Sequence, residues 1–106
     1  MAHLQRHGLK LLRRNFRCRQ GEIDAVMSDG AVLVFVEVRF RRNDRYGAGF
    51  ETVTRIKQRR IITAARAYLA RHRAGNATCR FDVVSVTKRN CAPEFMWVRN
   101  AFDQVG

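Results

Sequence analysis

The chain has 106 residues, of which 46% are hydrophobic, a size and composition that suit one small folded domain and exclude intrinsic disorder. Lysine and arginine number 21 against 9 aspartate and glutamate residues, which gives a formal net charge of +12. This excess predicts a polyanionic partner, most simply nucleic acid, and the planar fork of the abundant arginines suits phosphate oxygens. An anionic membrane is the competing partner, but the sequence has no long apolar span and no lipidation motif.

The compartment is predicted from the N-terminus and the cysteines. The first residues lack the apolar core of a signal peptide. Cys18, Cys79 and Cys91 are odd in number and widely spaced, which indicates a reducing cytoplasm and neither a disulfide framework nor a zinc site. We therefore expect a cytoplasmic protein with a single domain over residues 1–106.

The chain opens with His3 and His7, which are four residues apart and suit a solvated helix end better than a metal site, since no third ligand is near. Residues 11–16 predict a short strand beside the hairpin that follows. Its arginines are most simply a solvated basic edge, with phosphate contacts as the functional alternative. These arginines are Arg13, Arg14, Arg17 and Arg19.

Asp29-Gly30, flanked by two apolar-rich runs, predicts a β-hairpin with a two-residue turn. If these two residues are the centre of the turn, the numbers of paired residues sum to 59. Glu22, Asp24, Glu37 and Arg39 would then share one face of the sheet, because side chains alternate along a strand. The expected pairs include Val26–Leu33, Asp24–Phe35 and Glu22–Glu37.

Three carboxylates on one half-buried sheet face repel one another, so the arrangement needs compensation. One candidate is a divalent cation, and oxygen-only ligands of this kind suit Mg²⁺ or Mn²⁺ rather than zinc. Asp24 and Glu37 are diagonal neighbours across the hairpin. The alternative is a solvated face on which the carboxylates pair with Arg17, Arg19 and Arg39.

The rest of the chain predicts a strand–helix–strand passage. Residues 33–40 are nearly continuous in apolar residues, as in a central strand covered on both faces. A basic loop over residues 41–51 leads to a helix capped by Thr52 or Thr54 that continues to about His72. Residues 79–86 and 95–102 predict two further strands, the last at an edge. The expected buried face of the helix comprises Ile61, Ala64, Ala65, Tyr68 and His72.

Two single residues of the later strands have a structural interpretation. Asp82 is expected to pair with an arginine rather than to bind a metal. Trp97 is expected to be a packing residue rather than a platform for base stacking.

Several phrases of the sequence together resemble the bacterial YraN-like family, over residues 8–102. They are Arg14-Asn15-Phe16-Arg17-Cys18-Arg19, Gly21-Glu22-Ile23-Asp24, Leu33-Val34-Phe35-Val36-Glu37-Val38-Arg39, Lys57-Gln58-Arg59-Arg60 and Arg80-Phe81-Asp82-Val83-Val84. That family is similar in fold to archaeal Holliday-junction resolvases and belongs with the PD-(D/E)xK nucleases. The resemblance implies an α/β, restriction-endonuclease-like fold, with a mixed sheet of about five strands and a crossover helix.

The resemblance also implies roles for individual residues. Asp24 takes the position of the metal-binding aspartate, and Glu37 that of the acidic residue of the (D/E)xK element. Arg39 stands where the superfamily has lysine, and it keeps the charge but deprotonates far less readily. Gln58 resembles a helix glutamine that lines the site in some relatives. Relatives begin with a longer helix containing a Gly-Glu pair, so we expect a shortened N-terminal helix here.

The leading prediction is a Mg²⁺- or Mn²⁺-dependent endonuclease acting on structured or branched DNA. Asp24 and Glu37 would hold the metal, Glu22 would be a further ligand or base, and Arg39 would neutralise phosphate charge. One alternative is a catalytically silent nucleic-acid-binding module, and another is an assembly protein that forms a homodimer. The residues expected to follow the nucleic-acid backbone are Arg41, Arg42, Arg45, Arg55, Lys57 and Arg59.

Overall fold

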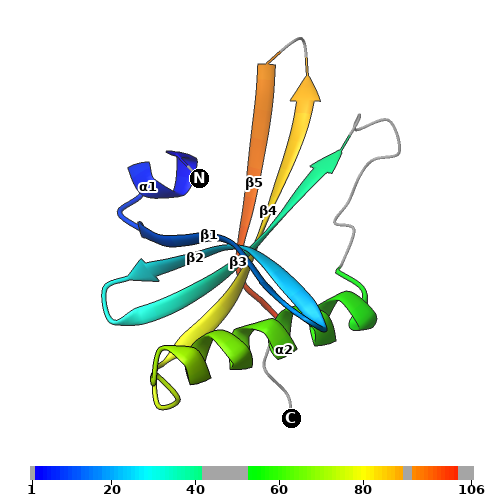
Figure 1. Ribbon diagram of the computed structural model, residues 1–106. Coiled ribbons are helices and arrows are strands. Elements are labelled where there is room, and N and C mark those ends of the chain that lie inside the picture. The colour runs from blue at the N-terminus through cyan, green and yellow to red at the C-terminus, as the bar shows by residue number, and fades with distance from the viewer. Residues whose placement is uncertain (1, 42–52, 90–91, 103–106) are drawn as a thin grey trace.

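The computed structural model describes residues 2–41, 53–89 and 92–102 of the chain, and the predicted loop arginines Arg42 and Arg45 lie outside these ranges. The described residues form two helices and five strands (Figure 1). In chain order these are α1 (Ala2–Arg6), β1 (Lys10–Cys18), β2 (Gly21–Asp29), β3 (Val32–Arg41), α2 (Arg55–Arg71), β4 (Cys79–Arg89) and β5 (Ala92–Phe102).

The strands form one mixed sheet in the order β1-β2-β3-β4-β5. Only β3 and β4 are parallel among these neighbours, and α2 lies between them in the chain as a crossover helix. The predicted α/β fold with a five-stranded mixed sheet is therefore confirmed. In Figure 1, β3, β4 and β5 extend together beyond the point where β1 and β2 diverge from them.

The predicted hairpin register was wrong by two residues. Asp29 pairs with Val32 and Ala25 with Val36, so paired numbers sum to 61 and the turn is Gly30-Ala31. Gly30 has a φ of 60°, a conformation that glycine adopts without steric cost. Asp29 remains in the strand, where its carboxylate lies 2.9 Å from the Arg80 guanidinium.

Helix α2 begins where the sequence predicts. The Thr54 side chain accepts a hydrogen bond from the backbone N–H of Lys57 at 3.2 Å, as an N-cap does. The predicted buried face was wrong at His72, which is exposed at the C-cap with its ring stacked on that of Tyr68. The buried residues of the helix are Ile61, Ile62, Ala64, Ala65, Tyr68 and Leu69.

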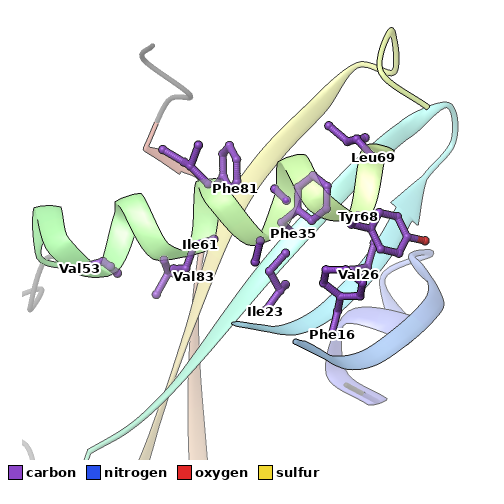
Figure 2. Packing of buried hydrophobic residues seen from close by; sticks show 13 residues of the cluster. Phe16, Ile23, Val26, Phe35, Val53, Ile61, Tyr68, Leu69, Phe81 and Val83 are labelled. Atoms are coloured by element: carbon purple, nitrogen blue, oxygen red, sulfur yellow. The ribbon is translucent and has the colours of Figure 1, made fainter. Parts of the chain in front are cut away.

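Two apolar clusters lie on opposite faces of the sheet. The larger one packs under α2, where Phe35 stacks on Phe81 and meets the edge of the Tyr68 ring (Figure 2). Full burial of such a side chain contributes about 1.5–3 kcal/mol. The smaller cluster includes Leu4 of α1, together with Met27 and other strand residues. With both faces covered, the predicted central position of β3 is confirmed.

Asp82 on β4 is 1% exposed and is surrounded by donors. The Arg80 Nε donates to Oδ1 at 3.1 Å, the Trp97 Nε1 to Oδ2 at 2.9 Å and the Asn100 backbone N–H to Oδ1 at 2.9 Å. Arg80 also donates to Asp29, which connects this group to β2. The interpretation of Asp82 as an ion-pair partner is confirmed, and Trp97 packs in the smaller apolar cluster.

Neither described helix has the length and apolar composition needed to cross a membrane.

Candidate active site

The site begins where β2 leaves β3. The last bridged pair of this ladder is Ala25–Val36, so Asp24 and Glu37 are the next residues on their strands. Asp24 does not continue the ladder through its backbone. Instead, its Oδ2 accepts a hydrogen bond of 2.7 Å from the backbone N–H of Val38. This bond holds the Asp24 carboxylate between the two diverging strands.

The regular alternation of β2 is interrupted at Asp24. Ile23 and Val26 both pack in the cluster under α2, whereas Ala25 and Met27 pack in the cluster on the other face. A strictly alternating strand would place Ile23 with Ala25. Asp24 therefore lies at an irregularity where the sheet divides, rather than on one smooth face as the sequence predicts.

Glu37 meets a lysine of the crossover helix. Its residue exposure is 6%, and its Oε2 lies 3.2 Å from the Nζ of Lys57. The Thr54 cap fixes the first turn of α2, from which the Lys57 side chain extends to β3. Lys57 was predicted as a nucleic-acid contact and considered as an amine supplied to the site from the helix, and the structure places its amine beside the carboxylate pair.

The pKa of Glu37 is raised from 4.5 to about 7, chiefly by burial and then by the hydrogen bond and negative charge of Asp24. The hydrogen bond and positive charge of Lys57 oppose this rise. The half-exposed ammonium therefore compensates only part of the repulsion between the two carboxylates. Near neutral pH, Glu37 can consequently gain or lose a proton readily.

The pair supplies the ligands that a hard divalent cation needs. Mg²⁺ is commonly held by one or two carboxylates together with water and substrate phosphates. Asp24 and Glu37 fit this pattern, and a cation would relieve the repulsion that raises the pKa of Glu37. Within residues 2–41, 53–89 and 92–102, no group of three or more His, Cys, Asp and Glu side chains could hold a metal.

Glu22 takes the ion-pair arrangement rather than joining the other two carboxylates. It lies opposite Arg17 in the β1–β2 ladder, and its Oε2 is 3.2 Å from the Arg17 Nε. Both side chains are more than half exposed, so the pair contributes little to stability. Of the predicted acidic residues, the structure brings Asp24 and Glu37 together and leaves Glu22 at the rim.

A basic groove of about 630 Å³ adjoins the lysine side of the site. One side of this groove depends on the close approach of Gly21 to α2. A Cβ at this position would lie 2.2 Å from the backbone oxygen of Arg60. The turn between β1 and β2 can therefore rest directly against α2. The groove is lined by Arg17, Cys18, Arg19, Gln20, Gly21, Glu22, Lys57, Arg60 and Ile61.

The other predicted site residues lie near the pair or around it. Arg39 is half-buried on β3, two residues after Glu37 and beside Ser85 of β4. The Gln58 side chain donates a hydrogen bond of 2.7 Å to the Val53 backbone oxygen, which braces the start of α2.

Only some of the residues predicted to contact the nucleic-acid backbone have side chains that the structure describes. Arg55 and Arg59 are exposed on α2, and Arg41 ends β3, with its side chain outside the described residues. Arg60 was not among the predicted residues, although it lines the groove with Lys57. Its position follows from the close approach at Gly21, a tertiary contact for which the sequence offers only the glycine itself.

The described chain is thus a small α/β protein with a carboxylate pair, a lysine and a basic groove at the point where its mixed sheet divides. Residues 1–86 match the family described as "Uncharacterised protein family UPF0102", and the chain belongs to this family, which is the YraN-like family that the sequence resembles.

Similar proteins from several bacteria bear the family name. The UPF0102 protein of Chromohalobacter salexigens is 55% identical over 101 residues, which cover 94% of this chain and 80% of that protein. The UPF0102 protein of Nitrosococcus oceani is 50% identical, with 94% and 82% covered. That of Stutzerimonas stutzeri is 47% identical over 104 residues, with 97% and 87% covered.

Proposed function

We propose that the protein is a metal-dependent endonuclease that acts on structured or branched DNA. The observation that carries the proposal is the pair Asp24–Glu37 beside Lys57, in which burial and a second carboxylate raise the pKa of Glu37 to about 7. A buried carboxylate next to a second carboxylate lowers the stability of the fold. Perturbed pKa values of this kind concentrate at functional sites. The net charge of +12 favours a polyanionic substrate.

In this mechanism Asp24 and Glu37 would hold Mg²⁺ or Mn²⁺, which would supply Lewis-acid chemistry at a phosphate oxygen and lower the pKa of a bound water. The Val38 N–H fixes the Asp24 carboxylate, so that this ligand does not need to reorganise when a cation arrives. Glu37, whose pKa is raised to about 7 without a metal, would release its proton when the cation binds. Lys57 supplies positive charge at the same carboxylate.

The remaining cations hold the substrate. Arg39 lies two residues from Glu37 on the same strand, so its guanidinium can address the phosphate next to the site. Arg17, Arg19 and Arg60 line the groove that leads away from Lys57 and can follow the sugar–phosphate backbone. This arrangement positions a strand by its charge and reads no base sequence.

The second candidate is a nucleic-acid-binding module without catalysis. Two observations favour it: arginine stands at position 39, and the described residues contain no cluster of three or more potential metal ligands. The basic groove serves both functions equally well, so binding alone does not distinguish them.

A cleavage assay separates the two candidates. Branched and linear DNA are incubated with the protein and Mg²⁺ or Mn²⁺, and products are resolved on a denaturing gel. The proposal expects cleavage of the branched substrate by the wild type and its loss in Asp24→Ala, with Glu22→Gln as the matched control that keeps activity. Binding without cleavage by any variant would instead establish the silent module.

Variants of the two nearby cations refine the assignment. We expect Arg39→Lys to keep or increase cleavage, because lysine retains the charge, and Arg39→Ala to weaken it. Equal losses in both variants, with folding intact by circular dichroism, would mean that the bidentate fork itself is required. Lys57→Met should reduce cleavage more than Arg59→Met, which removes an exposed cation two residues along the helix.

A further inference from the structure

A second cavity, of about 500 Å³, opens on the sheet face opposite α2. Asp24 lines it from β2, and Val38, whose N–H binds the Asp24 carboxylate, lines it from β3. The cavity therefore begins at Asp24, on the side away from Lys57 and the basic groove. Its remaining lining comes from α1, β1, β4, β5 and Phe40 of β3.

The lining of this cavity is unlike that of the basic groove. Val84 and Val86 contribute apolar surface from β4, and the rings of His3 and Phe95 stack on each other at 4.7 Å with an angle of 10° between them. Phe40 also lines the cavity and is 81% exposed. An aromatic side chain left this open, beside a hollow, is typical of a surface that binds another flat apolar group.

Two cations flank these rings. Arg6 of α1 and Arg14 of β1 line the same cavity, and both are exposed. An apolar, aromatic hollow with basic residues at its margin matches a nucleotide, in which a flat base is joined to charged phosphates. Proteins that bind single strands combine these two features, with aromatic rings stacking on bases and basic grooves following the backbone.

Building on the proposed nuclease function, we propose that this cavity receives an unpaired nucleotide of the DNA substrate. The base enters beside Phe40 and the His3–Phe95 stack, Arg6 and Arg14 contact its phosphates, and the adjoining phosphodiester lies at Asp24. A base inside a duplex cannot reach such a hollow without leaving its stack, so unpaired positions are favoured. The cavity thus supplies a physical reason for a preference for branched or gapped DNA.

Fluorescence of 2-aminopurine, which falls when the base stacks, tests this proposal. The probe is a short duplex with one unpaired 2-aminopurine nucleotide, compared with the same duplex carrying an abasic nucleotide there and with a fully paired duplex. We expect quenching with the wild-type protein, and affinity for the abasic duplex weaker by about fivefold or more, since stacking on aromatic side chains contributes at this level. No divalent metal is added, so cleavage does not interfere.

Phe40→Ala should abolish the quenching and bind the unpaired and abasic probes equally, whereas Phe40→Trp should retain the preference. The high exposure of Phe40 means that its loss leaves folding intact, which circular dichroism checks. Met96→Ala is the matched control, because Met96 is 49% exposed beside Phe95, which is 46% exposed, yet does not line the cavity.

Two failures are distinguishable. If the wild type binds the fully paired duplex as tightly as the unpaired probe and Phe40→Ala changes neither, the nucleotide cavity is wrong while the nuclease proposal stands. If the wild type binds no duplex even at low salt, the proposed function itself fails, and the cavity proposal fails with it.

Discussion

Two acidic residues are buried among the described residues: Asp82 on β4 and Glu37 on β3. Asp82 is surrounded by the Arg80 guanidinium, an indole N–H and a backbone N–H. Glu37 instead faces a second carboxylate, Asp24, and a lysine that is half exposed. The two carboxylates lie on adjacent parallel strands, where Val36, the neighbour of Glu37, pairs with Asp82.

Asp82 is a buried carboxylate whose oxygens are satisfied by donors, whereas Glu37 is a buried carboxylate beside a second negative charge. A buried charge is tolerated when donors satisfy its oxygens, as at Asp82. At Glu37, burial and then the only partly compensated repulsion from Asp24 raise the pKa to about 7. A protein that needed only stability would gain from a neutral residue at position 37. The unfavourable arrangement is therefore best explained by a ligand that relieves it.

The largest expected effect is on Asp82. Asp82→Asn removes the buried carboxylate that pairs with Arg80 and leaves Arg80 only its half-exposed partner Asp29. Breaking a buried pair in this way costs about 3 kcal/mol of unfolding free energy. Urea denaturation followed by circular dichroism measures the change. Glu22→Gln, which removes one member of an exposed pair, should stay within about 0.5 kcal/mol of wild type. Equal stability of Asp82→Asn and wild type would show that the donors around Asp82 do not stabilise the fold.

Replacing Glu37 should raise the unfolding free energy at high pH, whereas replacing Asp82 lowers it. The folded-state pKa of Glu37 is about 7 against an ordinary value of 4.5, so the folded protein binds more protons between these values. The contribution of Glu37 to stability is therefore fully present below about pH 4.5 and is lost as pH rises through 7, a decrease of about 1–3 kcal/mol. Glu37→Gln removes this loss and should be more stable than wild type at pH 8.

Urea denaturation of both proteins from pH 4 to pH 8 measures that difference, and titrating groups that do not interact with Glu37 cancel between the two curves. Parallel curves would show that Glu37 has no unusual proton affinity. A Glu37→Gln variant that is less stable than wild type at pH 8 would place Glu37 in the same structural class as Asp82.

A smaller effect is expected from the lysine. Lys57→Met removes the hydrogen bond and positive charge that hold down the pKa of Glu37, so that pKa should rise further. The rise should be roughly half a pH unit, because a half-exposed pair contributes less than about 1 kcal/mol. Carbon-13 NMR titration of the Glu37 carboxyl measures it, with Arg59→Met as the control. A fall in that pKa would contradict the assigned pairing.

Much of the fold could be predicted from local sequence signals. The Thr54 cap, the apolar run of β3 and the length of the strand–helix–strand passage are local features, and they specify a parallel crossover. The hairpin register could not be predicted in the same way. Asp29-Gly30 is a good turn sequence, but Asp29 is held in β2 by Arg80, which lies 51 positions away in the chain. A tertiary ion pair therefore decided between two turns that the local sequence permits.

The candidate site was predictable in its central residues and not at its margins. The two-residue shift in register still leaves Asp24 and Glu37 as neighbours, since each lies one position beyond the last bridged pair, Ala25–Val36. Glu22 was expected with them, yet its cross-strand partner is Arg17, as the structure's β1–β2 pairing shows. The basic groove depends on Gly21 meeting the backbone of Arg60, a contact that no periodic pattern encodes.

Mn²⁺ titration calorimetry at pH 6.5 and pH 8 tests whether Asp24 and Glu37 form the proposed cation site. A cation displaces the proton that Glu37 holds near its pKa of about 7, so binding should be weaker and release more protons at pH 6.5. Repeating the titration in two buffers of different ionisation enthalpy counts those protons. We predict binding by wild type and Glu22→Gln and its loss in Glu37→Gln. Equal binding by wild type and Glu37→Gln, with no proton release, would contradict the account.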